Sequence, residues 1–159
     1  MRLPLEELAE RYSDRLFAAA FSLTKNAQDA EDIVQETLLR YHTSNKEFES
    51  EEHIRAWLYR IAVNKAKNLN LSGWRRRNVP LDDYSASLSF EAPEESELFS
   101  CVMEMPKKYR IVIHLYYFED YSVKEIGDLL NLRESAVKQR LYRGRQYLKE
   151  RLKEGWHND

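Results

Sequence analysis

Apolar side chains recur at spacings of three and four along residues 1–72, the period of one buried helix face. A first helix is predicted over 5–23, with an inner face made of Leu5, Leu8, Ala9, Tyr12, Leu16, Ala19, Ala20 and Leu23. The second follows Thr24-Lys25, with Asn26 or Asp29 as its cap, and buries Ala30, Ile33, Val34, Thr37, Leu38 and Tyr41. The third follows Ser50, ends at Ser72-Gly73 and buries Ile54, Trp57, Leu58, Ile61, Ala62 and Leu69. Three long helices with short loops predict a bundle.

The same period returns after residue 93 and predicts a second helical unit. One helix begins near Pro93, and another starts at Pro106 and runs past Tyr116. A short helix follows Ser122, whose spacing to Glu125 is that of a capping box. Asn131 suits a tight turn, because asparagine tolerates positive φ. The last helix runs over 134–153, with Val137, Leu141, Leu148 and Leu152 inside.

The predicted fold class is therefore all-α, with two small helical domains joined by an acidic flexible linker. Residues 74–96 show no helical period, and residues 80–105 carry seven acidic and no basic side chains. We place a three-helix bundle at 1–76, the linker at 77–96 and a helix-turn-helix unit at 97–159.

Composition narrows the class of protein. Hydrophobic residues make up 43% of the 159 residues and charged residues 33%, which is typical of a folded globular chain. The single cysteine, Cys101, cannot form an internal disulfide, and no apolar run approaches the roughly 20 residues that cross a bilayer. A cytoplasmic location is expected.

Nothing in the sequence predicts catalysis. The four histidines and Cys101 lack metal-ligand spacing, and the four glycines form no phosphate-binding loop. We expect no enzyme activity, no metal, no cofactor and no small-molecule substrate.

The last helices have the pattern of a helix-turn-helix whose second helix enters the DNA major groove. Residues 133–153 carry eight basic and two acidic side chains, although the whole chain has a net charge of −2. Side chains that suit base contacts lie opposite its apolar stripe: Lys138, Gln139, Tyr142, Arg143, Arg145 and Gln146. Arg140, Lys149 and Arg151 lie where phosphates would run. A solvated basic face would explain the same residues.

Two faces of the first unit are candidate binding sites. Asp32, Gln35, Glu36 and Leu39 recur at helical spacing opposite the second helix's apolar stripe, as a protein-docking face could. Arg60, Asn64 and Lys67 share the outer side of the third helix, near Trp57 and Tyr59, and could hold an unstacked nucleotide. Ordinary solvent-facing positions would also explain both sets, and for Arg60, Asn64 and Lys67 the residues alone favour that explanation.

Three segments together resemble one family, the extracytoplasmic function (group 4) sigma factors of RNA polymerase. They are 29–37 (DAEDIVQET), 57–64 (WLYRIAVN) and 135–143 (SAVKQRLYR), in that order. The resemblance covers about residues 3–153. It implies that 1–76 is region 2, which binds the β′ clamp helices and the −10 element, and that the second unit is region 4, which reads the −35 element and packs on the β flap.

The resemblance also assigns roles to residues. Asp32, Gln35 and Glu36 match the polymerase-docking motif, and Leu39 lies on the same face. Asn64 matches the asparagine that holds a flipped −10 base, and the loop at 48–51 corresponds to the segment that completes its pocket. Lys138, Gln139, Tyr142 and Arg143 match the −35-facing positions. An anti-sigma factor is a further implied partner.

Gly127 and Gly144 stand where alanine is common in this family, which costs each helix about 1 kcal/mol of propensity.

Two other functions remain open. A stand-alone helix-turn-helix regulator would explain the C-terminal unit but leave the Leu39 face without a role. A helical adaptor that binds only protein would leave the basic face of 133–153 without one.

Overall fold

The computed structural model describes residues 1–69 and 93–157, and within these ranges all regular structure is helical. The chain divides into two compact units, Met1–Val79 and Pro80–Asp159. The first contains α1 (Leu5–Thr24), α2 (Ala27–Thr43) and α3 (Glu51–Lys67). The second contains α6 (Pro93–Glu104), α7 (Lys107–Ile113), the π-helix η1 (His114–Phe118), α8 (Val123–Leu130) and α9 (Glu134–His157). The predicted all-α class is confirmed.

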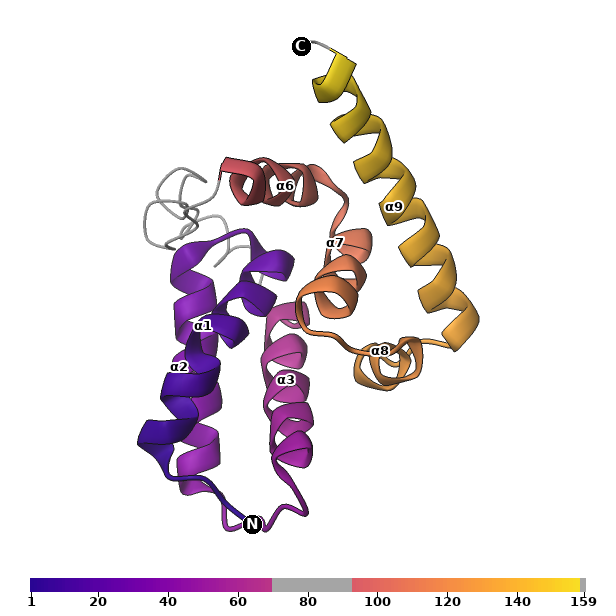
Figure 1. The fold of residues 1–159 in the computed structure, drawn as a ribbon. Helices are drawn as coiled ribbons and strands as arrows, with labels where there is room; N and C mark the ends of the chain where they lie inside the picture. Colours follow the sequence, from indigo (N-terminus) through magenta and orange to yellow (C-terminus); the bar gives the residue numbers. More distant parts are fainter. Residues whose placement is uncertain (70–92, 158–159) are drawn as a thin grey trace. The chain divides into compact units, whose positions relative to one another are not determined.

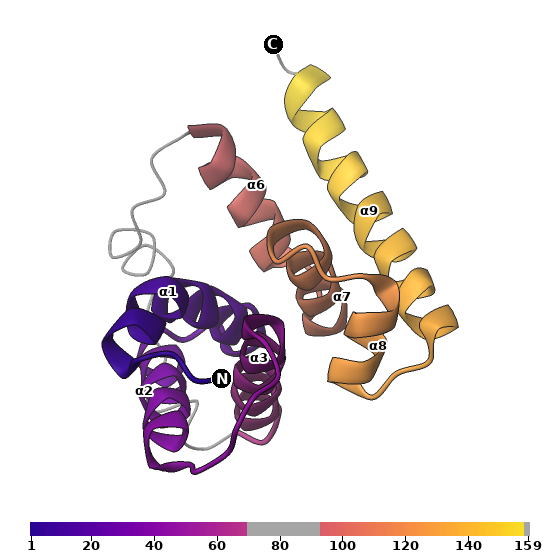
Figure 2. The ribbon, with the colours of Figure 1, turned by 60° about the horizontal axis from the view of Figure 1, so that its bottom comes forward.

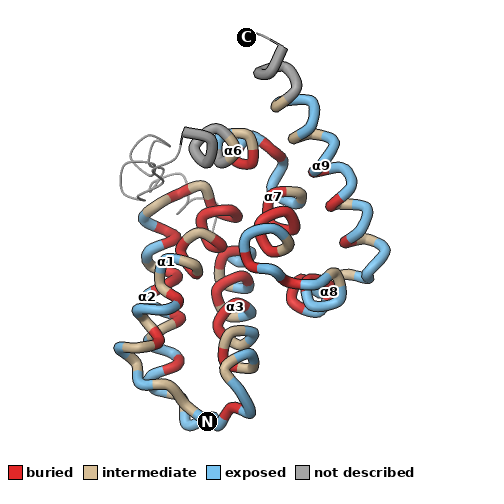
Figure 3. The backbone as a smooth tube through the Cα atoms, viewed as in Figure 1, coloured by how far each residue is buried: buried red, intermediate tan, exposed pale blue. Residues whose placement is uncertain are grey.

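The first unit is the predicted three-helix bundle, in which every helix contacts the other two (Figures 1 and 2). Its inner positions are buried along all three helices, as the red segments of Figure 3 show. Residues that are 0% exposed include Leu8, Leu16, Ala20, Ala30, Ile54, Leu58 and Ala62, which confirms most of the predicted stripes. Trp57 and Ile61 are only half-buried, whereas Tyr59 and Val63 are fully buried in their place.

Helix starts follow the predicted caps. The Asn26 side chain accepts a hydrogen bond from the Asp29 backbone N–H at 2.8 Å, and Ser50 Oγ accepts one from the His53 N–H at 3.1 Å. The end of α3 was predicted wrongly. The helix stops at Lys67, five residues before Ser72, and Asn68 is its C-cap. Ser72-Gly73 and most of the predicted linker lie outside the described residues.

The second unit contains the predicted helix-turn-helix. The capping box of α8 is complete: Ser122 Oγ accepts from the Glu125 N–H at 3.1 Å, and the Glu125 carboxylate accepts from the Ser122 N–H at 2.9 Å. Asn131 ends α8 with φ 59°, as expected of a tight turn. Helix α9 continues to His157, four residues beyond the predicted end.

Two glycines are required by close packing, which sequence propensity did not reveal. A Cβ on Gly127 would lie 2.7 Å from the Leu132 carbonyl oxygen, and a Cβ on Gly144 would lie 2.8 Å from Ile113 Cγ1. The turn and α7 therefore approach the helix backbone at these points. Each glycine lowers the helix propensity, but an alanine at either position would force the neighbouring atoms to move.

Candidate functional site

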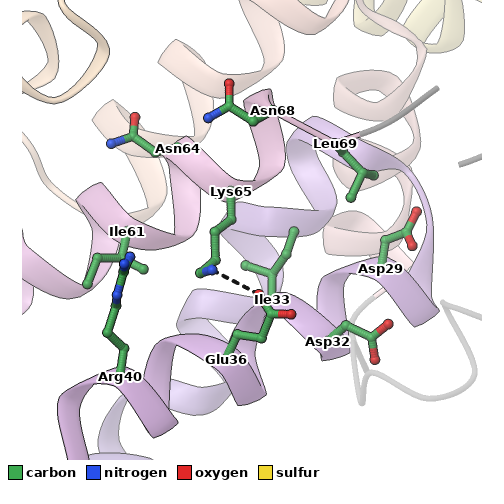
Figure 4. Close-up of a pocket in the computed structure, with 10 residues that line it drawn as sticks. All are labelled: Asp29, Asp32, Ile33, Glu36, Arg40, Ile61, Asn64, Lys65, Asn68 and Leu69. Carbon is green, nitrogen blue, oxygen red and sulfur yellow. Dashed lines mark ion pairs between the residues drawn. The ribbon is translucent and has the colours of Figure 1, made fainter. Parts of the chain in front are cut away.

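A hollow of about 540 Å³ lies between α2 and the C-terminal half of α3 (Figure 4). It is lined by Asp29, Asp32, Ile33, Glu36, Arg40, Ile61, Asn64, Lys65, Asn68 and Leu69. The sequence placed Asp32 and Glu36 in one site and Asn64 in another. The structure brings all three to the walls of the same groove, which periodicity within single helices could not reveal.

An ion pair crosses this groove. Lys65 Nζ lies 2.9 Å from Glu36 Oε2, and the two side chains are 30% and 60% exposed. On α2, Asp32 Oδ1 accepts a hydrogen bond from Gln28 Nε2 at 3.0 Å. Two cationic side chains, Lys65 and Arg40, and three carboxylates thus line one hollow. Its charge is mixed, and Lys65 was not among the predicted residues.

The remaining predicted residues of α2 lie outside the hollow. Gln35 and Leu39 are exposed and do not line the hollow. Leu39 is 60% exposed, although a single exposed leucine is by itself common on protein surfaces. Of the predicted docking face, Gln35, Glu36 and Leu39 are therefore exposed, whereas Asp32 is half-buried.

On α3, Asn64 and Asn68 extend from the same side, whereas Lys65 points toward α2 (Figure 4). Arg60, Asn64 and Lys67 are all exposed, as predicted for one outward face. The suggestion that Tyr59 could stack on a nucleotide is wrong, because its side chain is 0% exposed in the core. Trp57 packs edge-on against Phe48, with ring centroids 5.5 Å apart.

The face of α9 opposite Val137 and Leu141 presents the predicted polar side chains to solvent. Lys138, Gln139, Tyr142 and Arg143 are exposed, and Tyr142 is 61% exposed. Arg140 is half-buried at the edge of this face. The face can therefore present hydrogen-bond donors and positive charge to a duplex.

An aromatic cluster of η1 borders this face and was missed by sequence reasoning. Arg145 Nε donates to the Tyr117 hydroxyl at 2.6 Å, and its guanidinium lies 5.4 Å from the Tyr116 ring centroid. Tyr117 and Phe118 are each 49% exposed. The run of aromatic residues at 116–118 was the available signal, but the helical period placed only Tyr116, on the inner face.

Arg110 and His114 are two of the buried titratable side chains of the second unit. Arg110 donates from Nη1 to the Met105 carbonyl at 2.9 Å, and burial lowers its pKa to about 10. Burial also lowers the pKa of His114 to about 4, so the imidazole is neutral at pH 7. His114 stacks on Phe118 at 5.4 Å and is thus a packing residue.

Neither a metal site nor a membrane span is present in the part of the chain that the structure describes. No three His, Cys, Asp or Glu side chains there gather closely enough to hold an ion. None of the helices described is both long and apolar enough to cross a bilayer.

Two family matches together cover most of the chain. Residues 8–78 match the family described as Sigma-70 region 2, and residues 96–148 match Sigma-70, region 4. The second match contains the helix-turn-helix, and the first contains the groove between α2 and α3.

Curated relatives agree with these matches. The ECF RNA polymerase sigma factor SigW of Bacillus subtilis is 28% identical over 93% of this chain and 88% of its own length. The ECF RNA polymerase sigma factor SigF of Caulobacter vibrioides is 30% identical over 79% of this chain and 72% of its own.

Solved structures show the same fold. CnrH, in complex with the cytosolic domain of CnrY, is 29% identical, with a TM-score of 0.65 over 94% of this chain and 87% of that chain. The sigma factor RpoE of Bartonella quintana, in complex with the anti-sigma factor NepR, is 23% identical and shares the fold with a TM-score of 0.69, over 93% of this chain and 96% of that chain. The chain therefore belongs to the sigma-70 family of RNA polymerase sigma factors, in its extracytoplasmic function group.

Proposed function

We propose that this chain is a transcription initiation factor that binds core RNA polymerase, directs it to promoters through −35 and −10 recognition and helps to melt the −10 element. The observation that carries the proposal is the pairing of two matched regions, each with an exposed face of suitable chemistry. A stand-alone helix-turn-helix regulator is not favoured, because region 2 would then have no role.

In region 2, the strip of Asp32, Gln35, Glu36 and Leu39 is the proposed contact with the β′ clamp helices. Carboxylate and amide groups can pair with basic and polar side chains, while Leu39 can enter an apolar pocket on the partner. Its 60% exposure leaves the Leu39 side chain accessible to such a partner, as this assignment requires.

The outward face of α3 is the proposed −10 site. The Asn64 amide both donates and accepts, so it can pair with the edge of a base that has left the stack. Arg60 and Lys67 lie on the same face and can neutralise phosphates of the non-template strand. Tyr59 is unavailable, so any stacking partner must come from elsewhere.

The exposed face of α9 is the proposed −35 site. Arg143, Lys138 and Gln139 carry donors that suit guanine or adenine edges, and Arg140 lies where phosphates would run. The rest of region 4 is the proposed contact with the β flap.

No bond is made or broken in this mechanism, in keeping with the non-enzymatic family. A protein that binds the unstacked −10 strand more tightly than the duplex shifts the equilibrium toward the open state by that difference in binding free energy. Polymerase held at region 2 and duplex held at region 4 make this binding intramolecular, which raises its effective concentration.

Further assignments follow from the same proposal. We place region 2 at 1–76, the linker at 77–96 and region 4 at 97–159, with the protein in the cytoplasm beside polymerase. We also expect an anti-sigma factor as a partner, since CnrH, with the same fold, is held by a protein domain in its solved complex.

Binding of the full chain to core RNA polymerase tests the proposal. Leu39→Arg is expected to weaken binding about 30-fold or more, because it places a charge where about 2 kcal/mol of apolar contact is expected. Glu10→Arg, at an exposed position of α1, is the matched control and should bind normally. Equal affinity of the Leu39 variant and wild type, with both folded by circular dichroism, would contradict the docking assignment.

A further inference from the structure

The segment before α1 lies against the loop that joins α2 to α3, at one end of the bundle (Figure 1). Arg2 donates two hydrogen bonds to this region: Nη2 to the Tyr41 carbonyl at 2.8 Å and Nη1 to the Lys46 carbonyl at 2.6 Å. The Phe48 N–H donates to the Met1 carbonyl at 3.2 Å. Met1 and Arg2 thus hold the loop at Lys46 and Phe48 and the end of α2 at Tyr41, all 39 or more residues away along the chain.

The side chain of Tyr41 also joins α2 to the segment before α1. Its hydroxyl accepts from the Leu3 N–H and donates to the Leu3 carbonyl, both at 2.8 Å. The Arg2 guanidinium lies 4.4 Å from the Tyr41 ring centroid and 5.9 Å from that of Phe48. Tyr41 and Phe48 are 1% and 3% exposed, so Arg2 covers a buried aromatic pair.

This aromatic pair connects the loop to α3. Phe48 lies 5.8 Å from Tyr41 and 5.5 Å from Trp57, measured between ring centroids. Trp57 is seven residues, about two helical turns, before Asn64 on α3. Because Phe48 belongs to the loop, loss of its packing on Trp57 would release the loop from the helix that carries the proposed −10 contacts.

The fork of an arginine suits this position. The Tyr41 carbonyl is one of the last of α2, and the Lys46 carbonyl is in the loop, so one planar guanidinium fixes the loop relative to the helix. A lysine ammonium could bond one of these carbonyls but lacks the fork that reaches both.

We propose that Arg2 is a positioning residue for promoter specificity: it holds loop 44–50 in the conformation that discriminates among −10 bases. This inference rests on the proposed function and on the role that the family resemblance implies for the loop at 48–51, which is to complete the −10 pocket. Arg2 itself need not touch DNA. Its removal is expected to flatten base preference and to leave polymerase binding unchanged, because the Leu39 face is on the outer surface of α2.

The first arm of the test measures the loop alone. In the full chain with Trp74→Phe and Trp156→Phe, Trp57 is the sole tryptophan and reports on Phe48 packing. Arg2→Ala and Arg2→Lys should both increase acrylamide quenching of Trp57 about twofold. Asn45→Ala changes an exposed side chain of the same loop and keeps both carbonyl acceptors, so it should match wild type. Unchanged quenching in Arg2→Ala would overturn the positioning role.

The second arm measures specificity. Core polymerase with each variant selects from promoter fragments that are randomised over the −10 element, and sequencing gives the enrichment of each base. In Arg2→Ala, enrichment of the preferred base should fall about fivefold at one or two positions. Enrichment in Arg2→Lys should fall as well, and in Asn45→Ala it should not.

The outcomes separate this inference from the proposed function. Wild-type protein that selects no promoter would contradict the proposed function, while the Trp57 arm would still decide whether Arg2 holds the loop. Wild-type selection with an unchanged base profile in Arg2→Ala would overturn the inference alone. Uniform loss on all sequences would also overturn it, since that result indicates a purely stabilising residue.

Discussion

Lys65 Nζ lies 2.9 Å from Glu36 Oε2, so an ion pair joins the helix proposed to bind polymerase to the helix proposed to bind the −10 strand. Lys65 directly follows Asn64, and Glu36 belongs to the proposed docking strip. Any partner that binds the Glu36 carboxylate must compete with Lys65, and any phosphate that binds Lys65 must compete with Glu36. The two proposed functions therefore share one pair of charges.

The first prediction is that Lys65→Met raises the affinity for core polymerase. A partly exposed pair is worth up to about 1 kcal/mol, so its removal should tighten binding by at most about fivefold. In a Glu36→Gln background the same change should have no effect, because the competition is already absent. Titration of labelled polymerase with the four proteins of this double-mutant cycle checks both statements.

Salt provides the control for that cycle. The coupling between the two positions should shrink as ionic strength rises, since exposed charges are screened. Additive effects of the two changes at low salt would show that the ion pair does not compete with polymerase.

The second prediction concerns melting. Asn64→Ala should leave polymerase binding intact but lower the permanganate reactivity of −10 thymines, because an unstacked base loses its hydrogen-bond partner. Asn68→Ala removes the same amide one turn later on the same side of α3 and is the matched control (Figure 4). Equal loss in both variants would mean that melting depends on both asparagines and not specifically on Asn64.

The third prediction concerns the −35 element. Arg143→Ala should cost about 1–3 kcal/mol at the preferred sequence if its guanidinium reads a base. Competition between duplexes that differ at single −35 positions measures this cost. An equal loss on every duplex, with a shallower salt dependence, would instead assign Arg143 to a phosphate contact.

Local chemistry explains what could be predicted from the sequence. Asn26, Ser50 and the Ser122–Glu125 box fixed the helix starts because a cap acts within four residues. The end of α3 was missed, since no glycine or proline marks Asn68. The Glu36–Lys65 pair and the Arg2 contacts join residues 29 and 39 or more positions apart, and no local period reports on them.

The fourth prediction is that Gly127→Ala destabilises region 4, although alanine favours helices by about 1 kcal/mol. The new methyl group would lie 2.7 Å from the Leu132 carbonyl oxygen. This oxygen belongs to the backbone, so a side-chain rotation cannot relieve the clash. The turn between α8 and α9 must then shift, at a cost of about 1–3 kcal/mol. Urea unfolding followed by circular dichroism measures the change.

A matched variant distinguishes this clash from a general effect on α8. Asp128→Ala changes the neighbouring, exposed position of the same helix and should be neutral or slightly stabilising. A Gly127 variant as stable as wild type would mean that the turn can move without cost.

The last prediction concerns pH and follows from His114. Its side chain is 8% exposed, and within the described residues its Nε2 has no hydrogen-bond partner. Burial lowers the pKa from the ordinary 6.5 to about 4, so between these values the unfolded chain binds a proton that the folded chain does not. Proton binding by the unfolded chain therefore lowers the free energy of unfolding as the pH drops from 6.5 toward 4, by about 3 kcal/mol in total. Above pH 6.5 this loss is absent.

His114→Leu removes the titrating group and keeps an apolar side chain against Phe118. The free energy of unfolding of wild type minus that of the variant, measured from pH 4 to 7.5, should rise with pH and level off near 6.5. The other titrating groups contribute equally to both proteins and cancel in this difference. A difference that stays constant across the range would mean that His114 is protonated equally in the folded and unfolded chains, and hence that its ring reaches water.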